Sequence, residues 1–201
     1  MDPVLQTERY PNGKVKQTCH VQNGKLEGEV CSYSLAGQLI ERASFKAGNL
    51  DGQTIVYDEQ GVVAQKVSFK DGLQDGETAL FVAGELRAKL GYKGGKQNGE
   101  STLYQDGALS QKSQYKDGAL HGESLHYDAA GRVTRKAAYE KGMLSGMVVD
   151  YYPSGKILEV STYKNNKLDG ELRRYTEDGK LKERLCFQGG KQVPCGPAQR
   201  R

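Results

Sequence analysis

The chain has 201 residues, with 29 lysines and arginines against 25 aspartates and glutamates, and a formal net charge of +4. Its 26 glycines are about twice the usual share but follow no G-x-y period, which excludes a collagen-like chain. No stretch approaches the ~18 consecutive apolar residues of a membrane-spanning helix, so we expect no transmembrane segment. The mean hydropathy of −0.70 indicates a thin structure rather than a thick two-layer core.

The beginning of the sequence has no apolar segment of the kind found in signal peptides. We interpret residues 1–9, which precede the first recognisable repeat, as an N-terminal extension. Four cysteines form two pairs, Cys19 with Cys31 and Cys186 with Cys195, and each pair straddles a turn signal. Two local disulfides would suit an oxidising compartment, and four free thiols are the alternative. The cysteine spacings do not suit a zinc site.

A repeat of 23 or 24 residues runs from residue 10 to about residue 192, and residues 193–201 form a C-terminal tail. The copies contain a G-x-x-x-G unit, with Asn166 in place of the first glycine before Gly170, and we interpret this unit as a hairpin turn. Self-similarity at a fixed period is the signature of a repeat architecture. The second glycine of this unit recurs at intervals of 24, 24, 23, 23, 24 and 24 residues, at Gly28, Gly52, Gly76, Gly99, Gly122, Gly146 and Gly170. Single-residue deletions between Phe81 and Gly84 and between Tyr104 and Gly107 predict surface turns.

Apolar and polar residues alternate within each copy with the period of two that is typical of β-strands. The alternation places Leu39 and Phe45 on one side of a strand and Arg42 on the other. The sequence therefore predicts an all-β fold, an elongated, single-layer, twisted antiparallel β-meander of about eight tandem hairpin repeats. A first aromatic column contains Tyr10, Tyr33, Tyr57, Phe81, Tyr104, Tyr127, Tyr151 and Tyr175, and a second contains Phe45, Phe69, Tyr92, Tyr115, Tyr139, Tyr163 and Phe187.

Read across the copies, the unit is Y-x-x-x-G-x-[LVI]-x-x-x-x-x-[YF]-x-x-G-x-[LQ]-x-G-E, as in the stretch from Tyr57 to Glu77. This pattern resembles the MORN repeat, specifically the variant found in bacterial proteins called YwqK-like antitoxins. The resemblance covers residues 10–192 and implies a twisted single-layer antiparallel sheet. For function it implies an antitoxin or immunity protein that neutralises a cognate effector. Other MORN proteins are scaffolds or binders of membrane lipid.

Two faces of the predicted sheet are candidate partner-binding surfaces. An aromatic face would carry the second aromatic column, with Tyr92, Tyr115, Tyr139 and Tyr163 as candidates, although the same column would also serve as a thin core. The opposite face would carry basic residues, with Arg42, Lys66, Lys89, Lys112, Lys136 and Arg184 as candidates, although such a row can also be a solvated surface. A second basic row contains Lys46, Lys70, Lys93, Lys116 and Lys164. The recurring acidic residues after the second glycine favour cross-strand pairing.

Nothing in the repeat gathers unlike reactive residues, so we expect no enzyme and no cofactor. His121 occupies a position held in other copies by Glu27, Asp51 or Asp75. A metal or acid–base cluster of His121, His126 and Asp128 is the only catalytic alternative. Nucleic acid is not an expected partner, because acidic residues alternate with the lysines and because aromatic and basic residues are predicted on opposite faces.

These observations predict a protein that binds a cognate toxin or secreted effector, such as a type VI secretion effector, and covers its active site. The alternative is a MORN-type scaffold or a module that binds anionic lipid at a membrane surface. We expect a periplasmic location, with a signal or lipoprotein peptide that is absent from the given sequence. The cytoplasm is the alternative compartment.

Overall fold

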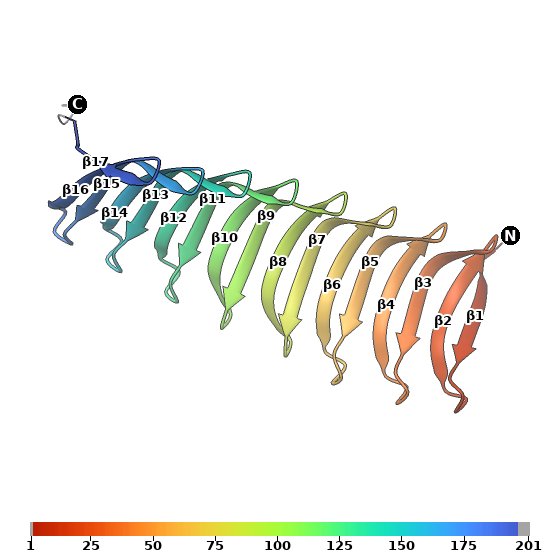
Figure 1. Ribbon diagram of the computed structural model, residues 1–201. Helices are drawn as coiled ribbons and strands as arrows, with labels where there is room; N and C mark the ends of the chain where they lie inside the picture. The colour runs from red at the N-terminus through yellow and green to blue at the C-terminus, as the bar shows by residue number, and fades with distance from the viewer. Residues whose placement is uncertain (1, 197–201) are drawn as a thin grey trace. The chain divides into compact units, whose positions relative to one another are not determined.

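The computed structural model describes residues 2–196, and every regular element in this range is a β-strand. The strands form one open antiparallel sheet of 17 strands, which confirms the predicted all-β meander (Figure 1). No helix in this range is able to span a membrane. The strands are β1 Val4–Arg9, β2 Val15–Gln22, β3 Lys25–Tyr33, β4 Leu39–Lys46, β5 Asn49–Tyr57, β6 Val63–Lys70, β7 Leu73–Val82, β8 Glu85–Lys93, β9 Lys96–Gln105, β10 Ala108–Lys116, β11 Ala119–Tyr127, β12 Val133–Glu140, β13 Met143–Tyr151, β14 Ile157–Lys164, β15 Lys167–Tyr175, β16 Leu181–Gln188 and β17 Lys191–Val193.

The chain divides into two compact units, Met1–Asn98 and Gly99–Arg201. In the first unit the strands from β1 to β8 pair in sequential order, from β1 with β2 to β7 with β8. In the second unit β9 to β17 pair in the same sequential order. Each strand therefore depends on its immediate neighbours, as expected of a repeat protein.

Two-residue turns connect the strands at one end of each hairpin. In the turn Ala47–Gly48 both residues have positive φ, 50° and 88°, which is the type I′ geometry that matches the twist of the flanking strands. Successive turns are also bonded to one another. The amide of Gly48 donates to the carbonyl of Leu26 at 2.9 Å, and the amide of Ala47 donates to the carboxylate of Glu27 at 2.8 Å. The acidic position before the second glycine therefore fixes the next turn in place.

Longer loops connect the strands at the opposite end. In the loop after β5, the Asp58 carboxylate accepts hydrogen bonds from the amides of Gln60 and Val62, at 3.0 and 2.8 Å. The two shortened copies replace this loop with two-residue turns, Ala83–Gly84 and Asp106–Gly107, in which all four residues have positive φ. Both deletions therefore lie in surface turns, as the sequence predicts.

The second glycine of each G-x-x-x-G unit lies inside a strand, so only the first glycine belongs to the hairpin turn and our interpretation of the whole unit as a turn was wrong. Gly76 in β7 has a φ of +106° and lies directly opposite Tyr92. A Cβ atom at Gly76 would lie 3.0 Å from the Cβ of Ser68 on β6. Glycine is therefore required here by the backbone conformation and by the close approach of the neighbouring strand.

The core is thin, because no second layer of secondary structure covers the sheet within residues 2–196: its main row consists mostly of small side chains, and a few residues such as Ile55 and Val149 are buried on the other face. Ser124 and Val148 are each only 1% exposed, and the hydroxyls of Ser113 and Ser124 are hydrogen-bonded at 2.8 Å. Because these side chains are small, the larger side chains beside them on the same face can shield them from solvent. In the first unit the row contains Val30, Ala43, Thr54, Val67 and Thr78, and in the second unit Ser101, Ser113, Ser124, Ala137, Val148, Ser161 and Leu172.

The ends of the described chain depart from two expectations. Residues 4–9, expected to be an extension, form β1 and pair with β2. A disulfide joins Cys186 to Cys195, but Cys19 and Cys31 are free. Cys19 lies opposite Val30 and Cys31 lies opposite Thr18, so the two thiols occupy adjacent register positions and point to opposite faces of the sheet. Residues 197–201 of the expected tail lie outside the described residues.

Replacing Gly76 with alanine is expected to lower the free energy of unfolding by about 1–3 kcal/mol, through the positive φ and the contact with Ser68. Gly28 is a matched control, because it has a φ of +80° and a Cβ there would have no neighbour within 4 Å. Denaturant unfolding of the two variants should show the greater loss for Gly76→Ala. Equal losses would show that the approach of Ser68 has no energetic effect.

Candidate functional site

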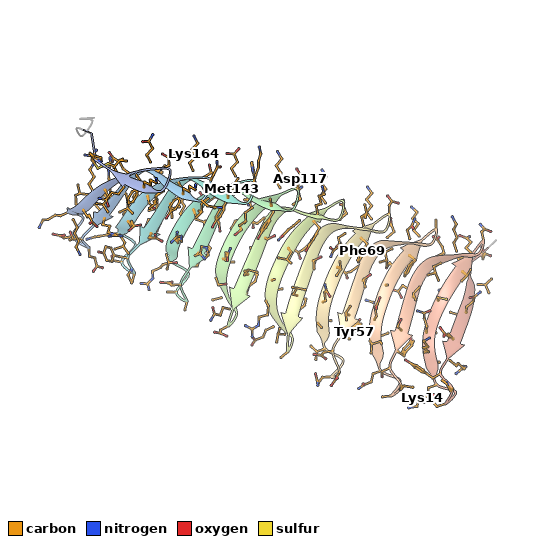
Figure 2. The ribbon with its side chains drawn as sticks, in the orientation of Figure 1. Lys14, Tyr57, Phe69, Asp117, Met143 and Lys164 are labelled. Carbon is orange, nitrogen blue, oxygen red and sulfur yellow. A yellow bond between two sulfur atoms is a disulfide. The ribbon has the colours of Figure 1, made fainter. Side chains whose placement is uncertain are left out.

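Alternation along the strands separates two faces of the sheet. On β6, Lys66, Ser68 and Lys70 lie on one face, which we call the basic face. Gln65, Val67 and Phe69 lie on the other, which we call the aromatic face. Figure 2 shows Phe69 near the two-residue turns and Tyr57 toward the longer loops. The two aromatic columns therefore occupy opposite ends of the strands.

The first aromatic column lies on the basic face, which corrects the predicted separation of aromatic and basic residues. Tyr57 alternates along β5 onto the same face as Ile55, which lies opposite Lys66, and a register shift that leaves Ala64 of β6 unpaired brings Val63 opposite Tyr57. Lys66 also places its Nζ 5.9 Å from the centre of the Phe81 ring, within the range of a cation–π contact. Similar shifts at the ends of other hairpins change the side chain alternation that the sequence predicts.

The predicted basic row is largely neutralised by glutamates on the adjacent strand. Lys89 Nζ lies 3.5 Å from Glu77 Oε2, and Lys112 Nζ lies 2.7 Å from Glu100 Oε2. The neighbouring glutamate raises the pKa of Lys112 through a hydrogen bond. Further pairs in the same row are Arg42 with Glu29, Lys136 with Glu123, and Arg184 with Glu171. The row is therefore a set of local ion pairs and does not form a continuous positive stripe.

The second basic row is not neutralised by ion pairs. Its lysines lie next to the two-residue turns and are exposed, and within the described range none of them forms an ion pair; they are Lys46, Lys70, Lys93, Lys116 and Lys164. Figure 2 shows Lys164 and Met143 at the turn ends of their strands, and Asp117 in the turn after β10. Acidic side chains such as Asp117 also occur at this end, so the charges there are mixed.

The candidate tyrosines of the aromatic face lie opposite glycines. Tyr92 pairs with Gly76 in the first unit, and Tyr163 pairs with Gly146 in the second. Tyr115 and Tyr139 have the same arrangement with Gly99 and Gly122. Because glycine has no side chain, each ring has room to lie against the backbone of the adjacent strand, and all four tyrosines are half-buried. The rings thus contribute to the core while keeping part of their surface accessible.

Ionisable residues form a continuous line across the aromatic face of the second unit, which our sequence reasoning missed. Each member is the direct cross-strand partner of the next, and we call the line the charged ladder. It consists of His126, Arg135, Asp150, Glu159, Arg174 and Glu183. The equivalent line in the first unit is mostly uncharged, with Val56, Gln65, Leu80 and Ala88. Comparing this one position among the copies would have revealed the difference.

The ladder is largely neutralised from within. Arg135 Nη1 lies 3.1 Å from Asp150 Oδ1, and Arg174 binds Glu159 and Glu183, each at 2.7 Å. Burial raises the pKa of Asp150, while the charge of Arg135 limits the rise and the facing Glu159 adds to it. Arg174 therefore lies between Glu159 and Glu183, whereas Asp150 and Glu159 face each other directly and each pairs with an arginine on its other side.

The histidine cluster suggested by the sequence does not form. Asp128 Oδ1 accepts hydrogen bonds from the amides of Ala130 and Arg132, both at 2.9 Å, and these bonds lower the pKa of Asp128. His126 instead lies opposite Arg135 in the charged ladder. Among residues 2–196 no three His, Cys, Asp or Glu side chains are placed to hold a metal ion.

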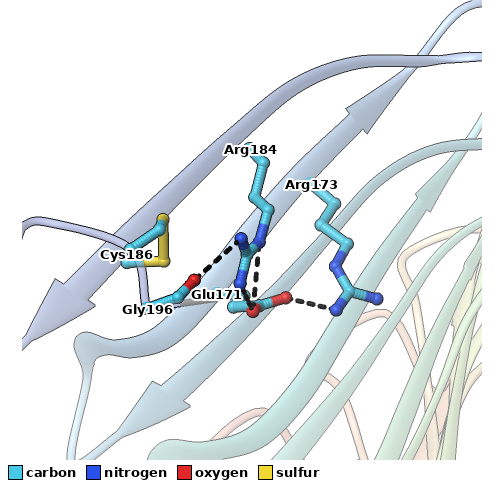
Figure 3. Close-up of a disulfide and its surroundings, with 6 residues drawn as sticks. Glu171, Arg173, Arg184, Cys186 and Gly196 are labelled. Atoms are coloured by element: carbon cyan, nitrogen blue, oxygen red, sulfur yellow. Dashed lines mark hydrogen bonds and ion pairs between the residues drawn. A yellow bond between two sulfur atoms is a disulfide. The ribbon is translucent and has the colours of Figure 1, made fainter. Parts of the chain in front are cut away.

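The Cys186–Cys195 disulfide lies beside a cluster of two arginines that share one glutamate (Figure 3). Arg184 and Arg173 both form ion pairs with Glu171, and hydrogen bonds from Arg184 lower the pKa of that carboxyl. Arg184 Nη1 also donates to the carbonyl of Gly196 at 3.2 Å. The disulfide thus holds the chain after β17 against the basic face.

Comparison with known protein families agrees with this architecture. A family model described as a MORN repeat variant matches slightly more than half of the chain, at residues 4–23, 26–47, 50–71, 144–165 and 168–188. The chain belongs to this family. Each MORN match spans one strand pair, so β1 is the first strand of a MORN repeat. The two shortened copies lie between the matched segments, and no curated protein matches the chain in sequence.

Replacing Arg174 with methionine should lower the melting temperature more at low salt than at about 1 M salt. The variant leaves Glu159 and Glu183 without their shared cation, and salt screens the repulsion between the two carboxylates. Lys180→Met is the control, because Lys180 is 83% exposed and its ion pair is with Asp178 in a loop. Thermal melts of both variants at the two salt concentrations measure the effect, and an equal loss at both would contradict an electrostatic role for Arg174.

Proposed function

We propose that this MORN protein is a non-catalytic binding module that neutralises a toxin or secreted effector by covering its active site. The observation that carries this proposal is a sheet whose two faces both present half-buried aromatic side chains, with no second layer over them in residues 2–196. Tyrosine beside mixed charges is typical of surfaces that bind proteins. Such a surface can bury the roughly 1,600 Å² of a standard protein complex.

The arrangement of ionisable residues supports binding rather than catalysis. The ion pairs of the basic face repeat from copy to copy, and the charged ladder is compensated by its own arginines. A general acid or base needs a carboxyl or imidazole that is free to exchange a proton with a substrate. Asp150 and Glu159 are instead engaged by arginines of adjacent strands.

A periplasmic location is part of the proposal. The Cys186–Cys195 disulfide supports it, because disulfides persist in oxidising compartments such as the bacterial periplasm. An effector that acts on lipid or on the cell wall would be an appropriate partner there. The two free cysteines do not oppose this location, since their register keeps them on opposite faces of the sheet.

Co-expression with the product of the neighbouring gene tests the proposed function. We expect the chain to restore growth when that product is toxic and to form a stable complex with it that survives size-exclusion chromatography. A catalytically inactive form of the neighbour product should bind equally well, because neutralisation by covering does not require its activity. Continued growth arrest together with the absence of a complex would contradict the proposal.

A second candidate function is binding to anionic lipid at a membrane surface. The exposed lysines of the second basic row favour it, because they form no ion pair within the described residues and recur at the same position of five hairpins, although Glu140 takes that position in one. Each lysine near an anionic surface contributes about 1 kcal/mol of attraction, which falls as salt rises.

Vesicles that contain phosphatidylserine provide the test of this second function. We expect the chain to float with the vesicles at low salt and to be released at high salt. Substituting Lys46, Lys70 and Lys93 with glutamine should weaken flotation, whereas substituting Arg42, which is already paired with Glu29, should change it little. No flotation at either salt concentration would exclude lipid binding.

A further inference from the structure

The β13–β14 hairpin lacks both residues of the ion pair that other hairpins form on the basic face. Five other hairpins place a glutamate and a basic residue here, and the β5–β6 hairpin has Gln53 with Lys66, but this hairpin has Met147 on β13 and Val160 on β14. The ion pair between Glu77 of β7 and Lys89 of β8 is an example of what is missing. A single replacement would leave one charge unpaired, but here both charges are replaced together by apolar side chains.

The result is an apolar strip on the basic face of the second unit. Met147, Val149 and Tyr151 alternate onto this face along β13, and Val149 and Tyr151 lie opposite Val160 and Ile157 of β14. Met147, Val160 and Thr162 line a surface depression together with Glu171 and Arg173. The apolar side chains of Met147 and Val160 therefore line the depression, and charged residues border it.

Met147 is not covered by its surroundings. It is 56% exposed although it lies in the interior of a strand, whereas comparable exposure at Leu35 and Leu73 occurs in or beside a turn. An apolar pair that merely replaced an ion pair for stability would gain by burying its side chains. Exposed methionine surrounded by polar residues is instead typical of a surface that binds another protein.

Cations lie on both sides of the strip. Lys136 is directly opposite Val149 on one side, and Arg173 is directly opposite Val160 on the other. Lys136 is paired with Glu123, but Arg173 and Arg184 share the single carboxylate of Glu171. Next to the apolar strip there is thus one more positive charge than negative, which favours a partner with a carboxylate at this place.

We propose that the strip formed by Met147, Val160 and Ile157 is the anchor point for a protein partner, and that it receives an apolar side chain flanked by an acidic residue. The apolar side chain would occupy the depression beside Met147, and the partner carboxylate would pair with Arg173. This inference rests on the proposed function and adds to it the surface used and the chemistry of the partner segment. Apolar and arginine anchors at the centre of an interface carry most of its binding energy.

The decisive variant restores the repeat pattern with Met147→Glu and Val160→Lys. Because this pair has the register of Glu77 and Lys89, the variant should keep the circular dichroism spectrum and melting temperature of the parent chain. The control exchanges an existing pair with Glu77→Lys and Lys89→Glu, which also changes two residues and leaves the net charge unchanged. Both variants are compared with the parent chain as full-length proteins.

Two probes keep the test of the strip separate from the test of the proposed function. The first is the neighbouring gene product, for which M147E/V160K should weaken affinity about 30-fold or more while E77K/K89E binds as the parent does. The second is a phage-displayed random peptide library selected on the parent chain. Selected peptides should share an apolar residue next to an acidic one and should lose binding to M147E/V160K alone.

The outcomes decide between the two proposals. Loss of binding by M147E/V160K alone supports the strip. A complex that tolerates M147E/V160K overturns the strip while the proposed function stands. If the neighbour product does not bind, the proposed function fails, and the peptide selection alone tests whether the strip binds a partner segment. Peptides that bind both variants equally, or a selection without enrichment, overturn it.

Discussion

The register between each in-strand glycine and the aromatic residue opposite it is the constraint on which the structure depends. Gly76 faces Tyr92, and its positive φ places the backbone within close reach of Ser68 on the preceding strand. A one-residue slip of register would move a whole set of side chains to the other face. Repeating the same arrangement in successive hairpins therefore fixes which residues lie on each face.

With the faces fixed, the balance of charge follows from the neighbours that the register provides. The lysines and arginines of the first basic row form ion pairs with glutamates of the adjacent strand. The remaining positive charge lies at the turn ends and beside Glu171, whose carboxylate is shared by two arginines. The chain has a positive net charge, yet most of its central basic residues are compensated locally. Recognition of a partner then depends on the few places where one copy differs from the others.

The repeat period, the strands and the two shortened turns could be predicted from the sequence because glycine spacing and alternation are local signals. The placement of the first aromatic column could not, because it depends on the pairing of Ile55 with Lys66 across strands, and the extra residue Ala64 in β6 interrupts the alternation that would connect Tyr57 with Phe69. The Cys19–Cys31 pairing was wrong for a related reason, since proximity in sequence does not reveal which face a side chain occupies. The charged ladder was missed because its members belong to different columns and meet only across strands.

The hydrogen bonds between successive turns have a consequence for how such a protein can change in length. The amide of Gly72 donates to the carbonyl of Leu50 just as the amide of Gly48 donates to that of Leu26, and the same bond recurs in both units, so these hairpins present the donor and acceptor that their neighbours need. Removing or duplicating one complete hairpin would join matching partners again, whereas removing a single strand would leave them facing the wrong way. Evolution can therefore adjust the number of recognition surfaces by whole modules.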